Sequence, residues 1–245
     1  MAETLAALLL AHVLADFVLQ SNAMIASKRA PTTLMLHTAL VLATAMATTG
    51  QVAHPAILAL GAAHLIIDTI KTYASTDTLP AFLMDQAAHI ATLIAAAALV
   101  PDLWASGGWA QNLPPAVTTP LLHAMILLAG LIITTRAGGF AVGKLMAPHA
   151  VSFTPDGLPE GGKIIGLLER GLIYLLMLID QPGAIGFLIA AKSVMRFETA
   201  SKEQKAAEYV IIGTLASFAW ALAVTIAVIT LRDALPPLEI TTTKP

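Results

Sequence analysis

Residues 8–20, LLLAHVLADFVLQ, contain a histidine and an aspartate within an otherwise apolar segment. His12 and Asp16 are four residues apart, so in a helix their side chains lie one turn apart on the same face. Ionisable side chains are costly in hydrocarbon unless they bind a partner, and they mark functional sites in membrane helices. The spacing therefore predicts that His12 and Asp16 meet further polar groups inside the protein.

The same residue types recur 52 residues further along the chain. Three pairs share this offset, namely His12 and His64, Asp16 and Asp68, and His37 and His89. The strings LLAHVLAD at 9–16 and GAAHLIID at 61–68 align at the same offset. Three coincidences at one offset predict an internal repeat. We expect residues 1–100 to form two copies of a helical hairpin, related by an axis along the membrane normal.

The second copy contains one additional carboxylate. Asp85 lies one helical turn before His89, where the first copy has Thr33. At a rise of about 1.5 Å per residue, the histidines and aspartates of both copies fall into a layer about 10 Å thick. We therefore expect them to surround a common centre.

This set of side chains suits a divalent metal ion. The predicted ligands are His12, Asp16, His37, His64, Asp68, Asp85 and His89. Imidazole suits zinc and iron, whereas carboxylate suits manganese and magnesium and also balances the charge. We expect zinc first, with manganese, iron or magnesium as alternatives; the absence of cysteine excludes a thiolate site. Two other interpretations stay open: a proton or ion relay, and a metal-free His–Asp network that fixes helix packing.

The composition indicates the environment of these residues. Of the 245 residues, 57% are hydrophobic and 11% are charged, and the mean hydropathy is +0.80. Soluble domains contain about 25% charged residues. The low charged fraction therefore predicts an integral membrane protein, and the net charge of −2 argues against a nucleic-acid partner.

Eight apolar segments reach or approach the roughly 20 residues of a membrane-spanning helix. They lie at about 3–20, 34–50, 55–73, 82–100, 117–135, 163–180, 183–197 and 206–231. This pattern predicts an all-α, polytopic membrane bundle of about eight helices in a single domain, 1–245. The repeated hairpins occupy 1–100, and 117–231 contains the C-terminal helices. The Gly- and Pro-rich connection at 140–162 predicts a loop with a short helix at 140–146.

Lysine and arginine predict the orientation of the helices. Nine of them lie in the first, third, fifth and seventh connections: Lys28, Arg29, Lys71, Arg136, Lys144, Lys163, Arg196, Lys202 and Lys205. The even connections, around 51–54, 101–116 and 181–182, contain none. Because cytoplasmic loops are enriched in these residues, we expect the odd connections in the cytoplasm and both termini on the outer side. The His/Asp layer then lies toward the cytoplasmic face.

Charged residues also occur inside the predicted C-terminal helices. The segments GGKIIGLLERGLIYLL, GFLIAAKSVMRFE and AEYVIIGTLASF contain Glu169, Arg170, Lys192, Arg196 and Glu208. Ionisable groups within a membrane are functional candidates, and cationic ones bind lipid phosphate. We assign substrate binding to the last four and catalysis to Glu169, together with Asp85 of the second repeat. Alternatively, Arg196 extends from its helix end to the lipid headgroups.

Several motifs together resemble a known family. The strings HVLADFVLQ, DQAAH, GGKIIGLLERGLI, GFLIAAKSVMRF and AEYVIIGTLASF look like those of a bacterial inner-membrane family classed as a domain of unknown function. The resemblance extends over about residues 8–220. It implies a one-domain protein of the bacterial inner membrane, with both termini then periplasmic, and it implies no activity. A looser pattern, His and Asp on successive helices, is similar to membrane-bound metal-dependent hydrolases.

We therefore expect a membrane-embedded, metal-dependent hydrolase. A divalent ion lowers the pKa of a bound water toward neutrality and so supplies a nucleophile. The expected substrate is lipid-like or phosphorylated and is bound at the cytoplasmic side, so the expected partners are membrane lipid and an anionic molecule. A homo-oligomer stays open. The alternatives are an ion- or proton-coupled transporter or channel, because repeated helices also build carriers, and a non-catalytic membrane scaffold.

Overall fold

The structure is a computed structural model that describes residues 1–149, 160–200 and 204–238, with the backbone alone for 195–200 and 206. Every regular element in these ranges is helical, and no strand occurs among them. Six helices are long and apolar enough to cross a membrane. The predicted all-α class is confirmed, and the helices are compatible with a multi-pass membrane protein.

The six candidate spans correspond to six of the eight predicted segments. They are Ala2–Leu19, Pro31–Thr49, Pro55–Ala74, Leu79–Leu99, Pro115–His149 and Ala207–Asp233. The other two segments form α9 (Gly161–Leu178) and α10 (Gly183–Ala200), which are helical as expected. However, α9 carries three charged residues, and the apolar part of α10 is confined to Gly183–Val194. Length and composition therefore support six spans, and eight spans stay a prediction.

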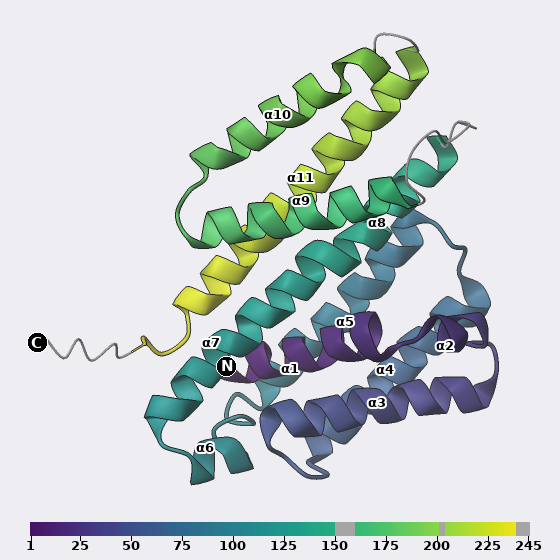
Figure 1. Ribbon diagram of the computed structural model, residues 1–245. Coiled ribbons are helices and arrows are strands. Elements are labelled where there is room, and N and C mark those ends of the chain that lie inside the picture. Colours follow the sequence, from purple (N-terminus) through teal and green to yellow (C-terminus); the bar gives the residue numbers. More distant parts are fainter. Residues whose placement is uncertain (150–159, 201–203, 239–245) are drawn as a thin grey trace, which may run out of the picture. The chain divides into compact units, whose positions relative to one another are not determined.

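The helices belong to two compact units, Met1–Ala129 with Thr230–Pro245, and Gly130–Ile229. The first unit begins with α1 (Ala2–Leu14), the π-helix η1 (Ala15–Leu19), α2 (Asn22–Ala26), α3 (Pro31–Thr49), α4 (Pro55–Ala74), α5 (Leu79–Leu99) and α6 (Gly108–Asn112) (Figure 1). α7 (Pro115–Ile132) and α11 (Gln204–Asp233) have residues in both units.

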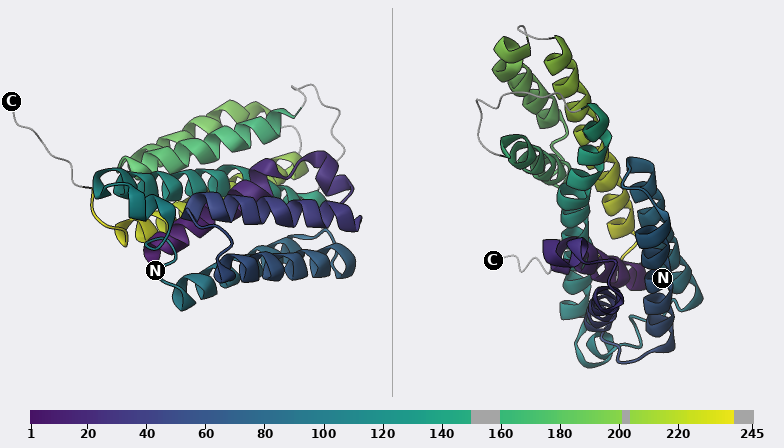
Figure 2. Two further views of the ribbon diagram at one scale, coloured as in Figure 1. Left: turned by 90° about the horizontal axis from the view of Figure 1, so that it is seen from below. Right: turned by 90° about the vertical axis from the view of Figure 1, so that its right-hand side faces the viewer.

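Four long helices form the body of the first unit. α1 and α4 each pack against both α3 and α5, so the four helices surround a common interior (Figure 2). The apolar side chains in this interior are Leu8, Ala11, Ala45, Ile57, Leu60, Leu93, Ala96 and Leu103. Ala6 and Ala7 of α1 are completely buried, because small side chains allow neighbouring helices to approach closely. The polar residues described below lie in the same interior.

The helix starts are encoded locally. α3, α4 and α5 each begin with a proline in the first turn, namely Pro31, Pro55 and Pro80. Proline is tolerated there because the first N–H groups of a helix have no intrahelical partner. The side chains of His54 and Thr78 accept hydrogen bonds from backbone N–H groups in the first turns of α4 and α5. These features fix where the three helices begin.

α3 ends at Gly50, whose φ of +68° lies in the left-handed region. A Cβ at this position would lie 2.8 Å from the backbone nitrogen of Trp109. The backbone N–H of Gly108 donates to the Gly50 carbonyl at 2.7 Å, and Trp109 Nε1 donates to the Ala47 carbonyl at 2.7 Å. Both the φ angle and the close approach of Trp109 therefore require glycine.

Replacing Gly50 by alanine should lower the unfolding midpoint of the detergent-solubilised protein. The left-handed conformation alone costs an L-residue about 1–2 kcal/mol, and the new Cβ would collide with Trp109. The control is Gly143→Ala in α8 (Gly138–Met146), where a Cβ meets nothing within 4 Å. Thermal unfolding followed by circular dichroism measures both variants, and equal midpoints would contradict the requirement.

The second unit consists of the end of α7, the π-helix η2 (Ile133–Ala137), α8, the 3-10 turn η3 (Ala147–His149), α9, α10 and most of α11. Its apolar core contains Ile173, Ile185, Phe218 and Ala221. Residues 140–146 are helical as expected, but α8 continues α7 and η2 without a break in the span Pro115–His149, so the predicted loop does not begin at 140. The predicted loop that follows falls largely at 150–159, outside the described residues.

Candidate metal centre

All seven predicted ligands lie together where α1, η1, α3, α4 and α5 meet. They are His12 on α1, Asp16 in η1, His37 on α3, His64 and Asp68 on α4, and Asp85 and His89 on α5. They form three overlapping triads whose ligand atoms lie within 4.8 Å of one another. Six of the seven are buried, and the side chain of Asp16 is 10% exposed. The structure therefore brings together every residue that the sequence assigned to this set.

The closest contacts join the two halves of the proposed repeat. His37 Nε2 and His64 Nε2 lie 3.1 Å apart. Asp16 Oδ1 lies 3.4 and 3.6 Å from these two nitrogens, and Asp68 Oδ2 lies 3.5 and 3.6 Å from them. Tetrahedral zinc, with bonds of about 2.0–2.1 Å, requires ligand atoms about 3.4 Å apart. Each carboxylate thus forms, with the two imidazoles, a triangle of the size that three zinc ligands require.

The ring of His89 is held with one nitrogen available as a ligand. Its Nδ1 lies 2.9 Å from the Asp85 carbonyl oxygen. A carbonyl can only accept, so Nδ1 carries the proton and Nε2 has a free lone pair. Nε2 is buried and has no hydrogen-bond partner within the described ranges of the chain. A histidine that donates one ring N–H to a backbone carbonyl has the arrangement typical of metal ligands.

Gln86 fixes the ring of His12 in a similar way. The Gln86 side-chain N–H donates to Asp85 Oδ2 at 3.0 Å, and its carbonyl oxygen lies 3.4 Å from His12 Nε2. That nitrogen must therefore be the donor, which leaves the lone pair on His12 Nδ1. Nδ1 lies 3.8 Å from Asp16 Oδ1. Two acceptor atoms that face each other favour a cation nearby.

Five buried ligand atoms of the set have no hydrogen-bond partner among the described residues. They are Asp16 Oδ1, His37 Nδ1, Asp85 Oδ1 and His89 Nε2, together with Asp68 Oδ2, which lies 2.9 Å from Lys28 Nζ but outside hydrogen-bond geometry. Buried polar atoms are normally satisfied, and a group of exceptions at one place indicates a bound ion or water. Oxygen and imidazole nitrogen atoms are ligands for zinc and other divalent ions. The residues present therefore fit a divalent metal.

Asp16 reaches the other helices from a π-helical turn. The backbone N–H of Gln20 donates to the carbonyl of Ala15, five residues earlier, at 3.1 Å. The additional residue in this turn widens the helix, a feature that is frequent at functional sites. Asp16 is closer to His37 and His64 than to His12. The i, i+4 spacing predicted a contact along one helix, whereas the main contacts of Asp16 cross to two others.

Two lysines that the residue pattern did not assign to the site contact the cluster. Lys28 Nζ lies 3.0 Å from Asp68 Oδ1 and 2.9 Å from Oδ2, and Lys71 Nζ pairs with Asp85 Oδ2. Both lysines had been assigned to cytoplasmic connections by the charge pattern alone. A buried carboxylate requires a partner of opposite charge. The three aspartates of the set could therefore have indicated that nearby lysines turn toward them.

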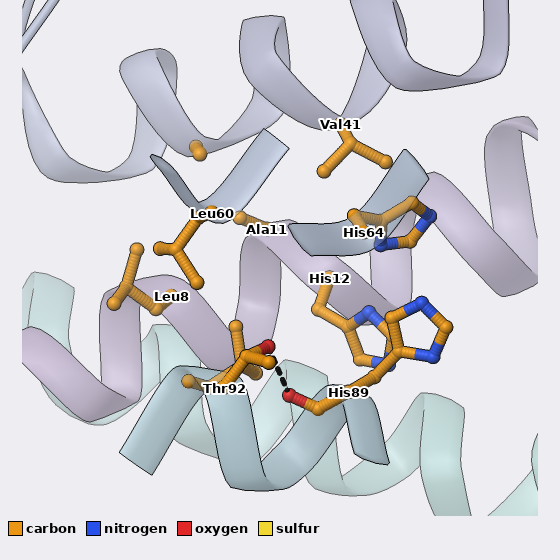
Figure 3. A pocket seen from close by; sticks show the side chains of 10 residues that line it. Leu8, Ala11, His12, Val41, Leu60, His64, His89 and Thr92 are labelled. Atoms are coloured by element: carbon orange, nitrogen blue, oxygen red, sulfur yellow. Dashed lines mark hydrogen bonds between the residues drawn. The ribbon is translucent and has the colours of Figure 1, made fainter. Parts of the chain in front are cut away.

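A small cavity lies beside the histidines. It has a volume of about 20 Å³ and is lined by His12, His64 and His89 together with apolar side chains and Thr92 (Figure 3). The Thr92 hydroxyl donates to the His89 carbonyl and so takes no part in satisfying the cluster. A cavity of this size holds about one water molecule. It has no room for an organic substrate.

Residues 4–111 match a family model described as "Protein of unknown function (DUF3307)". The predicted resemblance to a family of unknown function is thereby confirmed over this segment. It contains all seven ligands and both lysines. No curated protein and no solved structure matches the chain.

The charged residues of the C-terminal helices make separate contacts within the second unit. Glu169 and Lys192 form an ion pair at 2.7 Å, and Lys192 also lies over the ring of Phe218. Glu208 accepts a hydrogen bond from the side chain of Gln204 at 2.9 Å. The side chain of Arg196 lies outside the described part of the chain. Glu169 thus pairs with a cation of the same unit, and the partner given for Glu208 is a neutral side chain.

Arg170 is 4% exposed and bonds to neutral groups. Its Nε and Nη2 donate to the Thr135 carbonyl at 3.3 and 2.9 Å, and Nη1 donates to Ser217 Oγ at 3.2 Å. Cβ atoms at Gly139 and Gly166 would lie 3.2 and 3.1 Å from its guanidinium nitrogens. The glycines therefore make room for a guanidinium that binds the π-helical turn η2.

Asp16→Asn should abolish or strongly weaken metal retention. The substitution keeps the shape of the side chain but removes the one carboxylate of the set for which no lysine contact is seen in the described residues. We expect at least a hundredfold loss of affinity, more than a change to a group behind the ligands produces. Asp102→Asn, at an exposed residue of the same unit, should have no effect. Plasma-emission analysis of both purified proteins measures the metal, and equal contents would contradict the assignment.

Proposed function

We propose that the protein is a membrane-embedded hydrolase that depends on a divalent metal and acts on an anionic, lipid-like or phosphorylated substrate. The observation that carries the proposal is the group of five buried ligand atoms that have no hydrogen-bond partner among the described residues. A divalent ion beside His37 and His64 would bind two of them, Asp16 Oδ1 and Asp68 Oδ2, and would lower the pKa of a water molecule toward neutrality. Zinc is the first expectation because the triangles of ligand atoms have the size that tetrahedral zinc requires.

Asp85 is the proposed proton acceptor. Its Oδ2 is held by Lys71 and Gln86, whereas its Oδ1 has no hydrogen-bond partner. In hydrolysis of a phosphate ester, the water oxygen forms a bond to phosphorus while Asp85 Oδ1 takes a proton. The ester P–O bond breaks, and that proton passes to the departing alkoxide. A positioned carboxylate contributes about 10²–10⁴-fold to such a step.

The lysine end of the cluster is the proposed entry for substrate. The side chains of Lys28 and Lys71 are 18% and 32% exposed, whereas the histidines are buried. The small cavity on the apolar side admits no organic molecule. A substrate must therefore approach past the two ammonium groups, which favours an anion. Substrate binding by Arg170, Lys192, Arg196 and Glu208 and a catalytic role for Glu169, all in the second unit, stay predictions from the sequence.

An ion- or proton-coupled transporter is the second candidate. Its support is a run of adjacent imidazoles, in which the ring centroids of His37 and His64 lie 5.1 Å apart, and those of His64 and His89 lie 4.3 Å apart. His12 extends the run at 5.1 Å from His89. Adjacent histidines and carboxylates inside a membrane can relay protons.

Hydrolysis and transport are separated by one set of assays. With zinc or manganese, the purified protein in lipid nanodiscs should release phosphate from phosphatidate or p-nitrophenyl phosphate. Asp85→Asn should lower turnover at least a hundredfold, whereas Asp102→Asn should leave it unchanged. Absence of phosphate release, combined with zinc or proton flux in proteoliposomes that Asp16→Asn abolishes, would favour the transporter instead. A protein that binds no metal, releases no phosphate and transports no ion would instead be a scaffold.

The proposed topology has about eight spans in the bacterial inner membrane, with both termini periplasmic. In the proposed parallel repeat, α1 and α3 form the first hairpin and α4 and α5 form the second. Two observations support the repeat. In the repeat, His12 matches His64 and His37 matches His89, so the pair His37–His64 in one half corresponds to the pair His89–His12 in the other. The ring centroids lie 5.1 Å apart in both pairs. The helix contacts follow the same exchange, since α1 packs on α3 as α4 packs on α5.

Reporter fusions test this topology. A fusion at residue 30 should give a cytoplasmic signal, and a fusion at the C-terminus should give a periplasmic one, because nine lysines and arginines lie in the odd connections and none lies in the even ones. Alkaline phosphatase and green fluorescent protein report the two sides. Finding both sites on the same side would overturn the predicted number of spans.

A further inference from the structure

We infer that the cluster holds one divalent ion, and that Lys28 and Lys71 take the place of a second. This inference rests on the proposed metal function and deepens it. It concerns the number of ions, which neither the ligand set nor the family match decides.

The ligand atoms by themselves would accommodate two ions. Asp68 belongs to two of the three triads, one with His37 and His64 and one with Asp85 and His89. A carboxylate shared between two ligand sets can bridge two metals, as in di-metal sites of helix bundles. Something other than ligand spacing must therefore decide between one ion and two.

The two lysines are found at only one side of the cluster. Lys28 contacts both oxygens of Asp68, and Lys71 contacts Asp85. These two carboxylates belong to the triad that would hold the second ion. No lysine or arginine contact is seen for Asp16 in the described residues. The position between Asp16, His37 and His64 thus stays open to an ion, whereas in the other triad Asp85 is already paired with Lys71 and Asp68 with Lys28.

The net charge of the cluster also favours a single divalent ion. Three carboxylates and two ammonium groups leave one negative charge, with the histidines neutral. One divalent ion changes this to one positive charge, which suits an anionic substrate. A second ion would leave three positive charges in a buried site, and uncompensated buried charge costs several kcal/mol for each ion. The lysines therefore favour a single ion.

The differences between the two halves of the proposed repeat agree with this arrangement. Asp85 has no carboxylate counterpart in the first half, where Thr33 stands. Lys71 also has no counterpart, because Leu19 occupies the matching position. The additional carboxylate thus occurs with an additional lysine, and the pair adds no net charge. Asp85 then serves as a proton acceptor, and the ion is held by Asp16, His37 and His64 with Asp68.

The test is zinc titration of the full-length protein in detergent, with bound zinc measured by plasma emission after desalting. The wild type should retain one ion. Lys28→Met combined with Lys71→Met should retain two, or bind the first at least tenfold more tightly, because two positive charges have been removed. Lys163→Met, at a lysine that is 74% exposed and pairs with Glu160, should behave as the wild type.

Loss of Lys28 and Lys71 leaves two buried carboxylates without their lysine partners, and the variant could misfold for that reason. A second variant therefore serves as a control for folding. Asp85→Asn combined with Lys71→Met removes an ion pair without changing the net charge, and it should retain one ion with unchanged affinity. Loss of that ion would overturn the inference, as would two ions in the wild type. One ion of unchanged affinity after both lysines are removed would also overturn it. No ion in any variant would instead overturn the proposed metal function itself.

Discussion

Burial of charged and polar side chains in an apolar helix bundle is the constraint on which the first unit depends. Three carboxylates and four imidazoles lie in its interior, and His37 is only 1% exposed. Removing one such group from water without a partner costs several kcal/mol. The side chains therefore contact one another across four helices, and Lys28 and Lys71 enter from the more exposed side to neutralise two of the carboxylates. A divalent ion would neutralise the remainder.

The helix geometry serves this arrangement in detail. Small residues on α1 allow the four helices to approach closely, which brings His37 of α3 and His64 of α4 close to Asp16 of η1. The π-helical turn at Asp16 and the hydrogen bonds from Gln86 and the Asp85 carbonyl set the side-chain directions and the tautomers. These supporting groups are neither metal ligands nor apolar core residues. Their role is to leave lone pairs directed into the cluster.

The second unit manages its charges differently. Glu169 and Lys192 neutralise each other, and the buried Arg170 is satisfied by a backbone carbonyl and a hydroxyl group. The Thr135 carbonyl belongs to the π-helical turn η2, and glycines provide the space for the guanidinium. Arg170 is thus a buried cation whose hydrogen bonds go to neutral acceptors.

The sequence by itself determined the helical class and all seven members of the His/Asp set, because the apolar segments and the spacing of histidine and aspartate can be read from the chain without its tertiary structure. It did not determine the pairing of Lys28 with Asp68 or of Lys71 with Asp85. Those contacts depend on side-chain reach between segments that are 40 and 14 residues apart, and a charge count assigns such lysines to loops. The π-helical turn at Asp16 was also decided by tertiary structure, because its backbone pattern differs from an α-helix by one residue and has no distinct sequence signature. Burial favours a cation beside a carboxylate, but only the folded arrangement of the helices decides that Lys28 lies beside Asp68 and Lys71 beside Asp85.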